Sequence, residues 1–334
     1  MAKLKENIKI RSTEIKNRLV MPPMATSNCK EDGIITEDLI NYYDDRAKSG
    51  HIGMIITEHA YITQQGKASL NQMSIADDST IEGLTKLART IKQSGSTAII
   101  QINHAGSRTN EETTGMNPVG PSAVDHPAVE KFRLSEAEAL TKEGIDEIVQ
   151  LFAQAAKRAE QAGFDGVEVH SAHGYLLNQF YSPLTNKRVD EYGTSQIQSR
   201  VRFHKEVLQA IRRVVSYDFI VGLRLGACDY KLGGSSVEDG VRAVRHLDSY
   251  IDYIHITGGI FGYTTARLEG AGYFRDASMA LKEDGTIKAP VILTGGVKTL
   301  DAANKVLEDD YADMVGVGRA ILKDAHWADE AFEK

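Results

Sequence analysis

One feature constrains the fold above all others: short β-branched apolar runs alternate with longer amphipathic segments along the whole chain. Eight such runs have the bounds Leu19–Met24, Gly53–Glu58, Thr97–Asn103, Gly166–His170, Phe219–Leu225, Asp252–Thr257, Pro290–Thr294 and Ala312–Val317. Between two of them, the segment from Thr141 to Ala162 has its apolar residues on one helical stripe and ends before Gly163. Runs that are apolar on both faces and alternate with helices predict a parallel sheet covered on both sides. Eight units predict a closed (β/α)8 barrel, the TIM barrel, rather than an open sheet.

The chain has 334 residues, which fits one α/β barrel with an insertion, so we expect a single domain over residues 1–334. The connection from His104 to Leu140 is longer than an ordinary βα loop and is interrupted by glycine and proline. Long loops in compact domains are usually functional. Because this one follows the third strand, we expect a capping insertion over residues 104–140 at the mouth of the barrel.

Composition excludes several classes of protein. The 39 basic and 46 acidic residues give a net charge of −7 and no basic run stands out, so neither a nucleic-acid nor an anionic-membrane partner is expected. No apolar stretch approaches the roughly 18–20 residues of a membrane span, and the charged start Met1–Glu6 does not resemble a signal peptide. Cys29 and Cys228 cannot form a C-x-x-C metal or iron–sulfur site. We expect a cytoplasmic protein, and a homo-oligomer is compatible with the sequence.

The segment 166–180 breaks from a β-branched run into Ser-Ala-His-Gly at the point where a buried barrel strand reaches the catalytic rim. We interpret His170 and His173 as paired hydrogen-bond donors to a substrate oxygen, with Tyr175 supplying a proton. The same two histidines could instead bind a metal ion, because metal-binding barrels also use histidines at strand ends. A metal-dependent barrel hydrolase is therefore an open alternative at this point.

Glycines follow the last two predicted strands. Gly295 and Gly296 come after the seventh, and the run Gly316-Val317-Gly318-Arg319 ends the eighth. Barrels bind phosphate at these loops, because backbone N–H groups and a helix N-terminus converge there. Arg319 adds a fixed positive charge. We predict a phosphate pocket, with ordinary tight turns as the alternative.

Two polar residues lie within apolar strands. Arg224 needs a partner, because an unpaired buried charge costs roughly several kcal/mol. Two interpretations of Arg224 are open. It could form a salt bridge with Glu58 or Glu168, or it could be a fixed cation beside a cofactor that becomes anionic on reduction. Gln101 points into the same barrel mouth. It could have a functional role there, or it could hydrogen-bond a neighbouring backbone group. Of the other histidines, His126, His246 and His326 are expected to be solvated or at the edge of the core, and His51, His59, His204 and His255 are unassigned.

With these residues the chain resembles the Old Yellow Enzyme family of FMN-dependent NAD(P)H oxidoreductases, which fold as a βα barrel. The resemblance covers essentially the whole length, and the stretch from Gly163 to Gly193 is its most specific part. The segments that carry it are Asn17–Met24, Gln101–Gly106, Gly163–His170, Ser182–Gly193 and Gly316–Arg319.

The resemblance implies a role for each matching position. His170 and His173 would bind the carbonyl or nitro oxygen of the substrate, and Tyr175 would be the proton donor. Gln101 would bind the pyrimidine edge of the flavin, and Arg224 would lie beside its N1 and O2 atoms. No metal is implied. The full set of implied FMN-binding residues is Pro23, Met24, Ala25, His59, Gln101, Arg224, Gly295, Gly296, Gly318 and Arg319.

The implied reaction has two halves in one site. NADPH or NADH would deliver hydride to flavin N5 and leave, and a small-molecule oxidant would then take the hydride. Activated C=C bonds of α,β-unsaturated carbonyls, quinones or nitro compounds are the implied oxidants. A flavin-binding protein without efficient turnover is a further alternative. One position departs from many relatives: Ala25 replaces a threonine or cysteine that hydrogen-bonds flavin O4, which predicts a lower reduction potential.

Overall fold

The computed structural model describes residues 2–127, 137–264 and 269–332. Within these ranges eight parallel strands form a closed barrel in the order β3-β4-β5-β8-β9-β10-β11-β12. Each strand overlaps one of the predicted apolar runs, so the predicted TIM barrel is confirmed. The strand bounds are β3 Leu19–Met21, β4 Met54–Tyr61, β5 Thr97–Asn103, β8 Gly166–Ser171, β9 Ile220–Gly226, β10 Tyr253–Thr257, β11 Val291–Thr294 and β12 Met314–Gly316.

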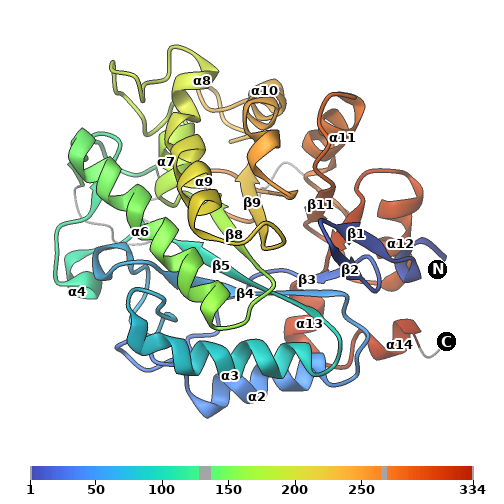
Figure 1. Cartoon of the computed structure of the whole chain (residues 1–334). Helices are drawn as coiled ribbons and strands as arrows, with labels where there is room; N and C mark the ends of the chain where they lie inside the picture. The colour runs from blue at the N-terminus through green and yellow to red at the C-terminus, as the bar shows by residue number, and fades with distance from the viewer. Residues whose placement is uncertain (1, 128–136, 265–268, 333–334) are drawn as a thin grey trace.

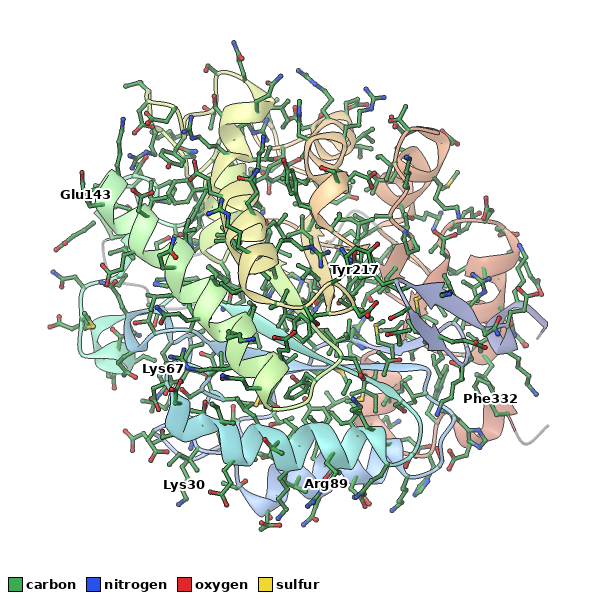
Figure 2. All side chains as sticks on the ribbon, in the orientation of Figure 1. Lys30, Lys67, Arg89, Glu143, Tyr217 and Phe332 are labelled. Carbon is green, nitrogen blue, oxygen red and sulfur yellow. The ribbon has the colours of Figure 1, made fainter. Side chains whose placement is uncertain are left out.

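Helices surround the barrel, and Figure 1 shows α2 and α3 side by side on one flank and α6 beside α9 on another. The side chains of Arg89 on α3 and Glu143 on α6 are exposed on the outer side of these helices (Figure 2). No helix within the described ranges is long and apolar enough to cross a membrane. The helix bounds are α1 Ala2–Lys5, α2 Glu37–Ala47, α3 Ile81–Lys92, α4 Glu111–Thr114, α6 Lys142–Gln161, α7 Leu176–Tyr181, α8 Ile197–Arg200, α9 Arg202–Val214, α10 Val237–Leu247, α11 Arg275–Glu283, α12 Leu300–Glu308, α13 Arg319–Lys323 and α14 Asp329–Phe332, with 3-10 turns η1 Gln64–Gly66, η2 Asp78–Thr80 and η3 Asp248–Tyr250.

Helix α6 forms where the apolar stripe predicted it. The hydroxyl of Thr141 caps its first turn by accepting a hydrogen bond from the N–H of Gly144 at 3.1 Å, which satisfies one of the free backbone donors of a helix start. The apolar stripe is buried against the barrel. The prediction of a helix between Thr141 and Gly163 is confirmed.

The inside of the barrel is apolar at the amino-terminal ends of the strands. A hairpin that the sequence analysis did not predict, β1 Ile8–Ile10 and β2 Thr13–Ile15, closes this end. Its residues Ile10 and Ile15 are buried against the first inward-facing side chains of the strands, at about 1.5–3 kcal/mol for each buried isoleucine. The strand residues in this cluster are Val20, Met54, Ile56, Ile99, Ile220, Tyr253, Ile292 and Met314. Buried apolar side chains therefore fill this end of the barrel.

The insertion after β5 is described in part. Within it, Val119–Gly120 (β6) and Glu138–Ala139 (β7) pair as short parallel strands. Residues 128–136 lie outside the described residues, so a capping role for this insertion remains a prediction.

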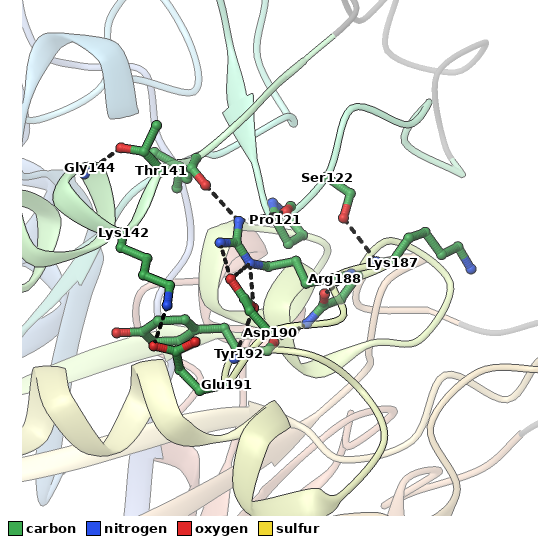
Figure 3. A network of polar contacts seen from close by, with 12 residues as sticks. Pro121, Ser122, Thr141, Lys142, Gly144, Lys187, Arg188, Asp190, Glu191 and Tyr192 are labelled. Carbon is green, nitrogen blue, oxygen red and sulfur yellow. Dashed lines mark hydrogen bonds and ion pairs between the residues drawn. The ribbon is translucent and has the colours of Figure 1, made fainter.

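A polar network binds the residues that follow β6 and β7 to the loop after α7 (Figure 3). Arg188 donates hydrogen bonds to the carbonyl oxygens of Pro121 at 3.1 Å and Leu140 at 2.6 Å. Asp190 holds the guanidinium in place through a contact of 2.6 Å. Charge-assisted hydrogen bonds of this kind are stronger than neutral ones. The Ser182–Gly193 segment thus has a structural role outside the barrel mouth.

Candidate active site

A cavity of about 460 Å³ opens at the carboxyl ends of the barrel strands, the end at which barrel enzymes hold their active sites. Thr257, Thr294 and Gly316, the last residues of β10, β11 and β12, mark this rim. Every residue to which the sequence analysis assigned a catalytic or cofactor-binding role lines the cavity: Pro23, Met24, Ala25, His59, Gln101, His170, His173, Tyr175, Arg224, Gly295, Gly296, Gly318 and Arg319. The structure brings these positions together, and their individual roles remain predictions.

Gln101 on β5 lies beside Glu168 on β8, in register across the two strands. The Nε2 atom of Gln101 donates a hydrogen bond to Oε1 of Glu168 at 2.7 Å, and both side chains are fully buried. This bond assigns the orientation of the amide. The Oε1 atom of Gln101 has no partner among the described residues and is left as an acceptor.

Glu168 is the centre of a buried network. Burial raises the pKa of its carboxyl, but His255 and Arg224 and the hydrogen bond from Gln101 outweigh this effect and hold the pKa below its ordinary value. The Nδ1 atom of His255 lies 2.8 Å from Oε2 of Glu168, and the Nε2 atom lies 2.7 Å from the hydroxyl oxygen of Thr294. Burial lowers the pKa of His255 despite the neighbouring carboxylate. A neutral His255 therefore donates from Nδ1 to Glu168 and accepts from Thr294.

Arg224 on β9 is buried within reach of the negative charge of Glu168. Of the two acids considered as its partner, Glu58 faces elsewhere and accepts a hydrogen bond from the hydroxyl of Thr26 at 2.6 Å. Burial raises the pKa of Glu58 to about 7. The Nε atom of Arg224 has no partner among the described residues. Glu168 balances the charge of Arg224, and the Nε donor of Arg224 remains for a ligand.

The turn after β8 directs three rings into the cavity. His173 and Gly174 adopt left-handed conformations, with φ of 59° and 78°, and a positive φ is unusual for a residue other than glycine. The rings of His170 and His173 lie 5.1 Å apart between centroids, nearly perpendicular, and Tyr175 lies 5.0 Å from His170. A Cβ atom at position 174 would lie 2.6 Å from Nε2 of His126, so glycine is required there. The change from strand to turn at Ser-Ala-His-Gly thus brings the three rings together at the cavity.

The paired histidines are held neutral. Burial, followed by the charges of neighbours that include Arg224, lowers the pKa of His170 and of His173 well below the ordinary value. The Nε2 atom of His173 lies 3.0 Å from the hydroxyl oxygen of Thr257, and the buried Nδ1 atom of His170 has no partner among the described residues. Each neutral imidazole carries one N–H donor. The pair can therefore donate to an oxygen without adding a positive charge.

His59 presents one ring nitrogen to the cavity in a defined state. Burial, with the charges of Arg108 and Arg224, lowers its pKa to about 4. The Nε2 atom of Gln72 lies 2.7 Å from Nδ1 of His59. Because the amide nitrogen can only donate, Nδ1 accepts and Nε2 carries the hydrogen. His59 is thereby a donor on the cavity wall.

At the other end of the cavity, the chain makes tight turns after β11 and β12. Gly296 has φ of 69°, and a Cβ atom there would lie 2.0 Å from the carbonyl oxygen of Gly270, so only glycine fits. The exposed Arg319 begins α13, and its Nη2 atom donates to the hydroxyl oxygen of Tyr273 at 3.3 Å. Open backbone and a cation together suit a phosphate.

The cavity fits FMN at each of its parts. The unpartnered Oε1 of Gln101 and Nε of Arg224 offer an acceptor and a donor in the same cavity, the kinds of group that the edge of a flavin pyrimidine ring requires. The glycine turns and Arg319 suit the phosphate. No group of three or more His, Cys, Asp or Glu side chains in the described part of the chain could hold a metal ion. The arrangement offers no support to the metal-hydrolase alternative.

Several residues of the site were missed or misplaced by sequence analysis. Glu168 was considered only as a partner of Arg224, and His255 was unassigned. His126, expected to be solvated or at the core edge, is buried, and its Nε2 atom lies 3.0 Å from the carbonyl oxygen of Gly174. Arg108 also lines the cavity. Its only sequence signal was a cation in the long loop after the third strand.

Comparison with known proteins agrees with this geometry. Residues 3–334 match the NADH:flavin oxidoreductase / NADH oxidase family. An NADPH dehydrogenase of Clostridium acetobutylicum is 38% identical and aligns over 97% of this chain and 93% of its own length. An NADH oxidase of Thermoanaerobacter brockii is 37% identical over 96% of this chain, which spans only 49% of that relative.

A solved structure shares the fold. The Old Yellow Enzyme homologue of Zymomonas mobilis superposes with a TM-score of 0.85 and 26% identity, covering 99% of this chain and 92% of that one. The family match covers nearly every residue, from the first strands to the last helix. The chain belongs to the Old Yellow Enzyme family of FMN-dependent NAD(P)H oxidoreductases.

Proposed function

We propose that the chain is an ene-reductase, which reduces activated C=C bonds of small molecules with NADH or NADPH as the reductant. The observation that carries the proposal is the convergence of two neutral imidazoles and Tyr175 on a cavity that also fits FMN. When bound, FMN accepts hydride from the nicotinamide and delivers it to the oxidant. The names of the relatives, NADH oxidase and NADPH dehydrogenase, support a nicotinamide as the reductant.

His170 and His173 would hold the oxygen of the oxidant. Negative charge grows on this oxygen as hydride reaches the β-carbon of an α,β-unsaturated carbonyl. Donors that are already in place before the charge develops stabilise the transition state without reorganisation. The left-handed turn at His173 and the hydroxyl of Thr257 hold one ring in position, and β8 holds the other.

Tyr175 would protonate the α-carbon. Its ring lies 5.0 Å from that of His170 and 5.3 Å from that of His59, on the wall of the same cavity. A proton donor must lie within hydrogen-bond reach of the atom that it protonates. The position of Tyr175 beside the proposed oxygen-binding pair supports this role, because the carbon to be protonated is next to the carbonyl group.

The remaining residues would hold the cofactor. Gln101 and Arg224 face the pyrimidine edge, and His59 and the backbone of residues 23–25 line the flanks. Gly295, Gly296, Gly318 and Arg319 form the phosphate pocket. The cavity uses residues from Pro22 near one end of the chain to Leu322 near the other, which supports a single FMN-binding domain.

Colour and redox behaviour test the proposal. A yellow purified protein, unaffected by a chelator, separates a flavoprotein from a metal-dependent hydrolase. Anaerobic NADH or NADPH should bleach the flavin, and 2-cyclohexenone should restore its absorbance. A flavin that NADH and NADPH leave oxidised would favour the storage or sensing alternative.

A further inference from the structure

Thr294 lies on the cavity wall, and no ligand-binding role has been assigned to it. It is the last residue of β11, it lines the cavity, and its side chain is partly buried. The hydroxyl oxygen of Thr294 lies 2.7 Å from Nε2 of His255. This is the only hydrogen bond that the hydroxyl makes with a described residue, so its oxygen keeps the capacity to bind a ligand.

The buried network behind Thr294 fixes the direction of its hydroxyl. The Nδ1 atom of His255 lies 2.8 Å from a carboxylate oxygen of Glu168, which can only accept, so Nδ1 carries the hydrogen. Because burial lowers the pKa of His255, the ring is neutral, and its Nε2 atom accepts from Thr294. The single hydrogen of the Thr294 hydroxyl is therefore already used. Toward a ligand, Thr294 can only be an acceptor.

The neighbouring strand leaves room for this hydroxyl. Thr294 is in register with Gly316 on β12. A Cβ atom at position 316 would overlap the hydroxyl oxygen of Thr294, so a larger residue there would displace the hydroxyl. Gly316 also lines the cavity. The glycine at the end of β12 thus keeps the Thr294 hydroxyl in place, in addition to any effect on the turn that follows.

Thr294 lies between the two parts of the cavity that fit FMN. On one side, His255 is in register with Arg224 at the proposed pyrimidine end. On the other side, Gly295 directly follows Thr294 and begins the proposed phosphate pocket. In FMN the ribityl chain joins the ring to the phosphate, and its hydroxyl groups are hydrogen-bond donors. The ribityl chain is therefore the part of FMN that suits an acceptor at this position.

We propose that Thr294 is a further FMN-binding residue, whose hydroxyl oxygen accepts a hydrogen bond from a hydroxyl group of the ribityl chain. This inference rests on the proposed FMN site. It gives Glu168 a second effect on the cavity wall, because the same carboxylate orients the amide of Gln101 and, by way of His255, the hydroxyl of Thr294. One buried acid thereby determines an acceptor for the ring and an acceptor for the chain.

Binding of FMN analogues to the apoprotein tests the proposal. The ligands are FMN and its monodeoxy analogues, each of which lacks a different ribityl hydroxyl, and quenching of flavin fluorescence gives each dissociation constant. Thr294→Val keeps the shape of the side chain and removes the hydroxyl, so FMN should bind about 3- to 10-fold more weakly, as for loss of one neutral hydrogen bond. For the analogue that lacks the donating hydroxyl, this ratio of variant to wild type should fall to about 1, because the bond is absent in both proteins.

Two further variants complete the experiment. Thr294→Ser keeps the hydroxyl and should bind FMN and every analogue as the wild type does. Thr85→Val, the same change at an exposed position on α3, is the control.

A general loosening of the cavity wall in Thr294→Val would weaken all the flavins equally. The same ratio of variant to wild type for FMN and for every analogue therefore overturns the role of Thr294. So does a Thr294→Ser protein that binds FMN as weakly as Thr294→Val. If the wild-type apoprotein binds no FMN, the proposed function itself fails, whereas tight FMN binding with equal ratios removes only the contact with Thr294.

Discussion

The amide nitrogen of Gln101 donates a hydrogen bond to Oε1 of Glu168 at 2.7 Å, between neighbouring strands inside the barrel. Neither side chain is exposed. Because the carboxylate can only accept, the nitrogen of Gln101 faces Glu168 and its oxygen faces the cavity. An acid that does not line the cavity therefore decides which hydrogen-bonding group Gln101 presents to the cavity.

Replacing this acid should weaken FMN binding. In Glu168→Gln, one amide replaces a carboxylate that accepts from Gln101, His255 and Tyr253, so at least one donor loses its acceptor and Arg224 loses its counter-charge. Loss of a buried hydrogen-bond partner costs about 1–3 kcal/mol, so the dissociation constant of FMN should rise about 10- to 100-fold.

Quenching of FMN fluorescence during titration of the apoprotein measures this constant. Glu143→Gln, an exposed change of the same chemistry on α6 (Figure 2), is the control and should bind FMN as the wild type does. A folded Glu168→Gln protein with wild-type affinity for FMN would show that Gln101 does not depend on Glu168.

Ala25 should leave the reduced flavin less stabilised than a hydroxyl-bearing residue would. The neighbouring hydroxyl of Thr26 donates to Glu58 at 2.6 Å and is not directed at the cavity. A hydroxyl in Ala25→Thr could donate to the flavin, and one hydrogen bond of about 1–2 kcal/mol corresponds to a rise of about 20–40 mV in a two-electron potential. Valine has the same shape as threonine but lacks the hydroxyl, so Ala25→Val should show no such rise in potential. Spectroelectrochemistry measures both values, and an unchanged or lower potential in Ala25→Thr would refute the hypothesis.

Acid should destabilise the protein partly through His204. This residue is buried, its Nε2 atom lies 2.6 Å from the hydroxyl oxygen of Ser171, and burial, followed by Arg200, lowers its pKa to about 3. Unfolded histidine has a pKa of about 6.5. Between these values the unfolded state binds a proton that the folded state does not, so the free energy of unfolding falls as the pH falls.

The effect of His204 on the free energy of unfolding can be calculated from these two pKa values. Each pH unit below 6.5 costs at most about 1.4 kcal/mol for one histidine, so going from pH 7 to pH 5 should cost the wild type about 2 kcal/mol more than His204→Asn. Urea unfolding of the FMN-loaded proteins at both pH values measures the difference. His246→Asn, an exposed change on α10, should behave as the wild type. Equal losses in the wild type and His204→Asn would count against a neutral buried His204.

The barrel was predictable because its strands are buried on both faces. The run Thr97–Asn103 coincides with β5, since every residue in it is buried. At β3 the prediction ran too long: Pro22 and Pro23 lack the amide hydrogen that a strand needs, and β3 ends at Met21. The hairpin formed by β1 and β2 was not predictable, because its three-residue strands are too short for a pattern and are stabilised by burial in the completed barrel.

The site was predictable where it depends on strand ends. The carboxyl ends of parallel strands converge, so Gln101, His170 and Arg224 could be placed at one rim. The direction of the Glu58 side chain could not be predicted, because β4 shifts register between Thr57 and Ala60. Arg108 depends on contacts that its neighbours make with residues 42 and 72 positions away in the sequence. Long-range contacts of this kind leave no local signal.

Phenol binding to the oxidised enzyme is the most direct test of the proposed oxygen-binding pair, His170 and His173. The dissociation constant, measured from the shift in flavin absorbance, should rise about 10- to 100-fold in His170→Ala/His173→Ala, because two hydrogen bonds of about 0.5–1.5 kcal/mol each are lost. The variant should keep its FMN, and His246→Ala should bind phenol as the wild type does. Equal phenol affinities in the wild type and the double variant, with FMN retained in both, would contradict the role given to the two histidines.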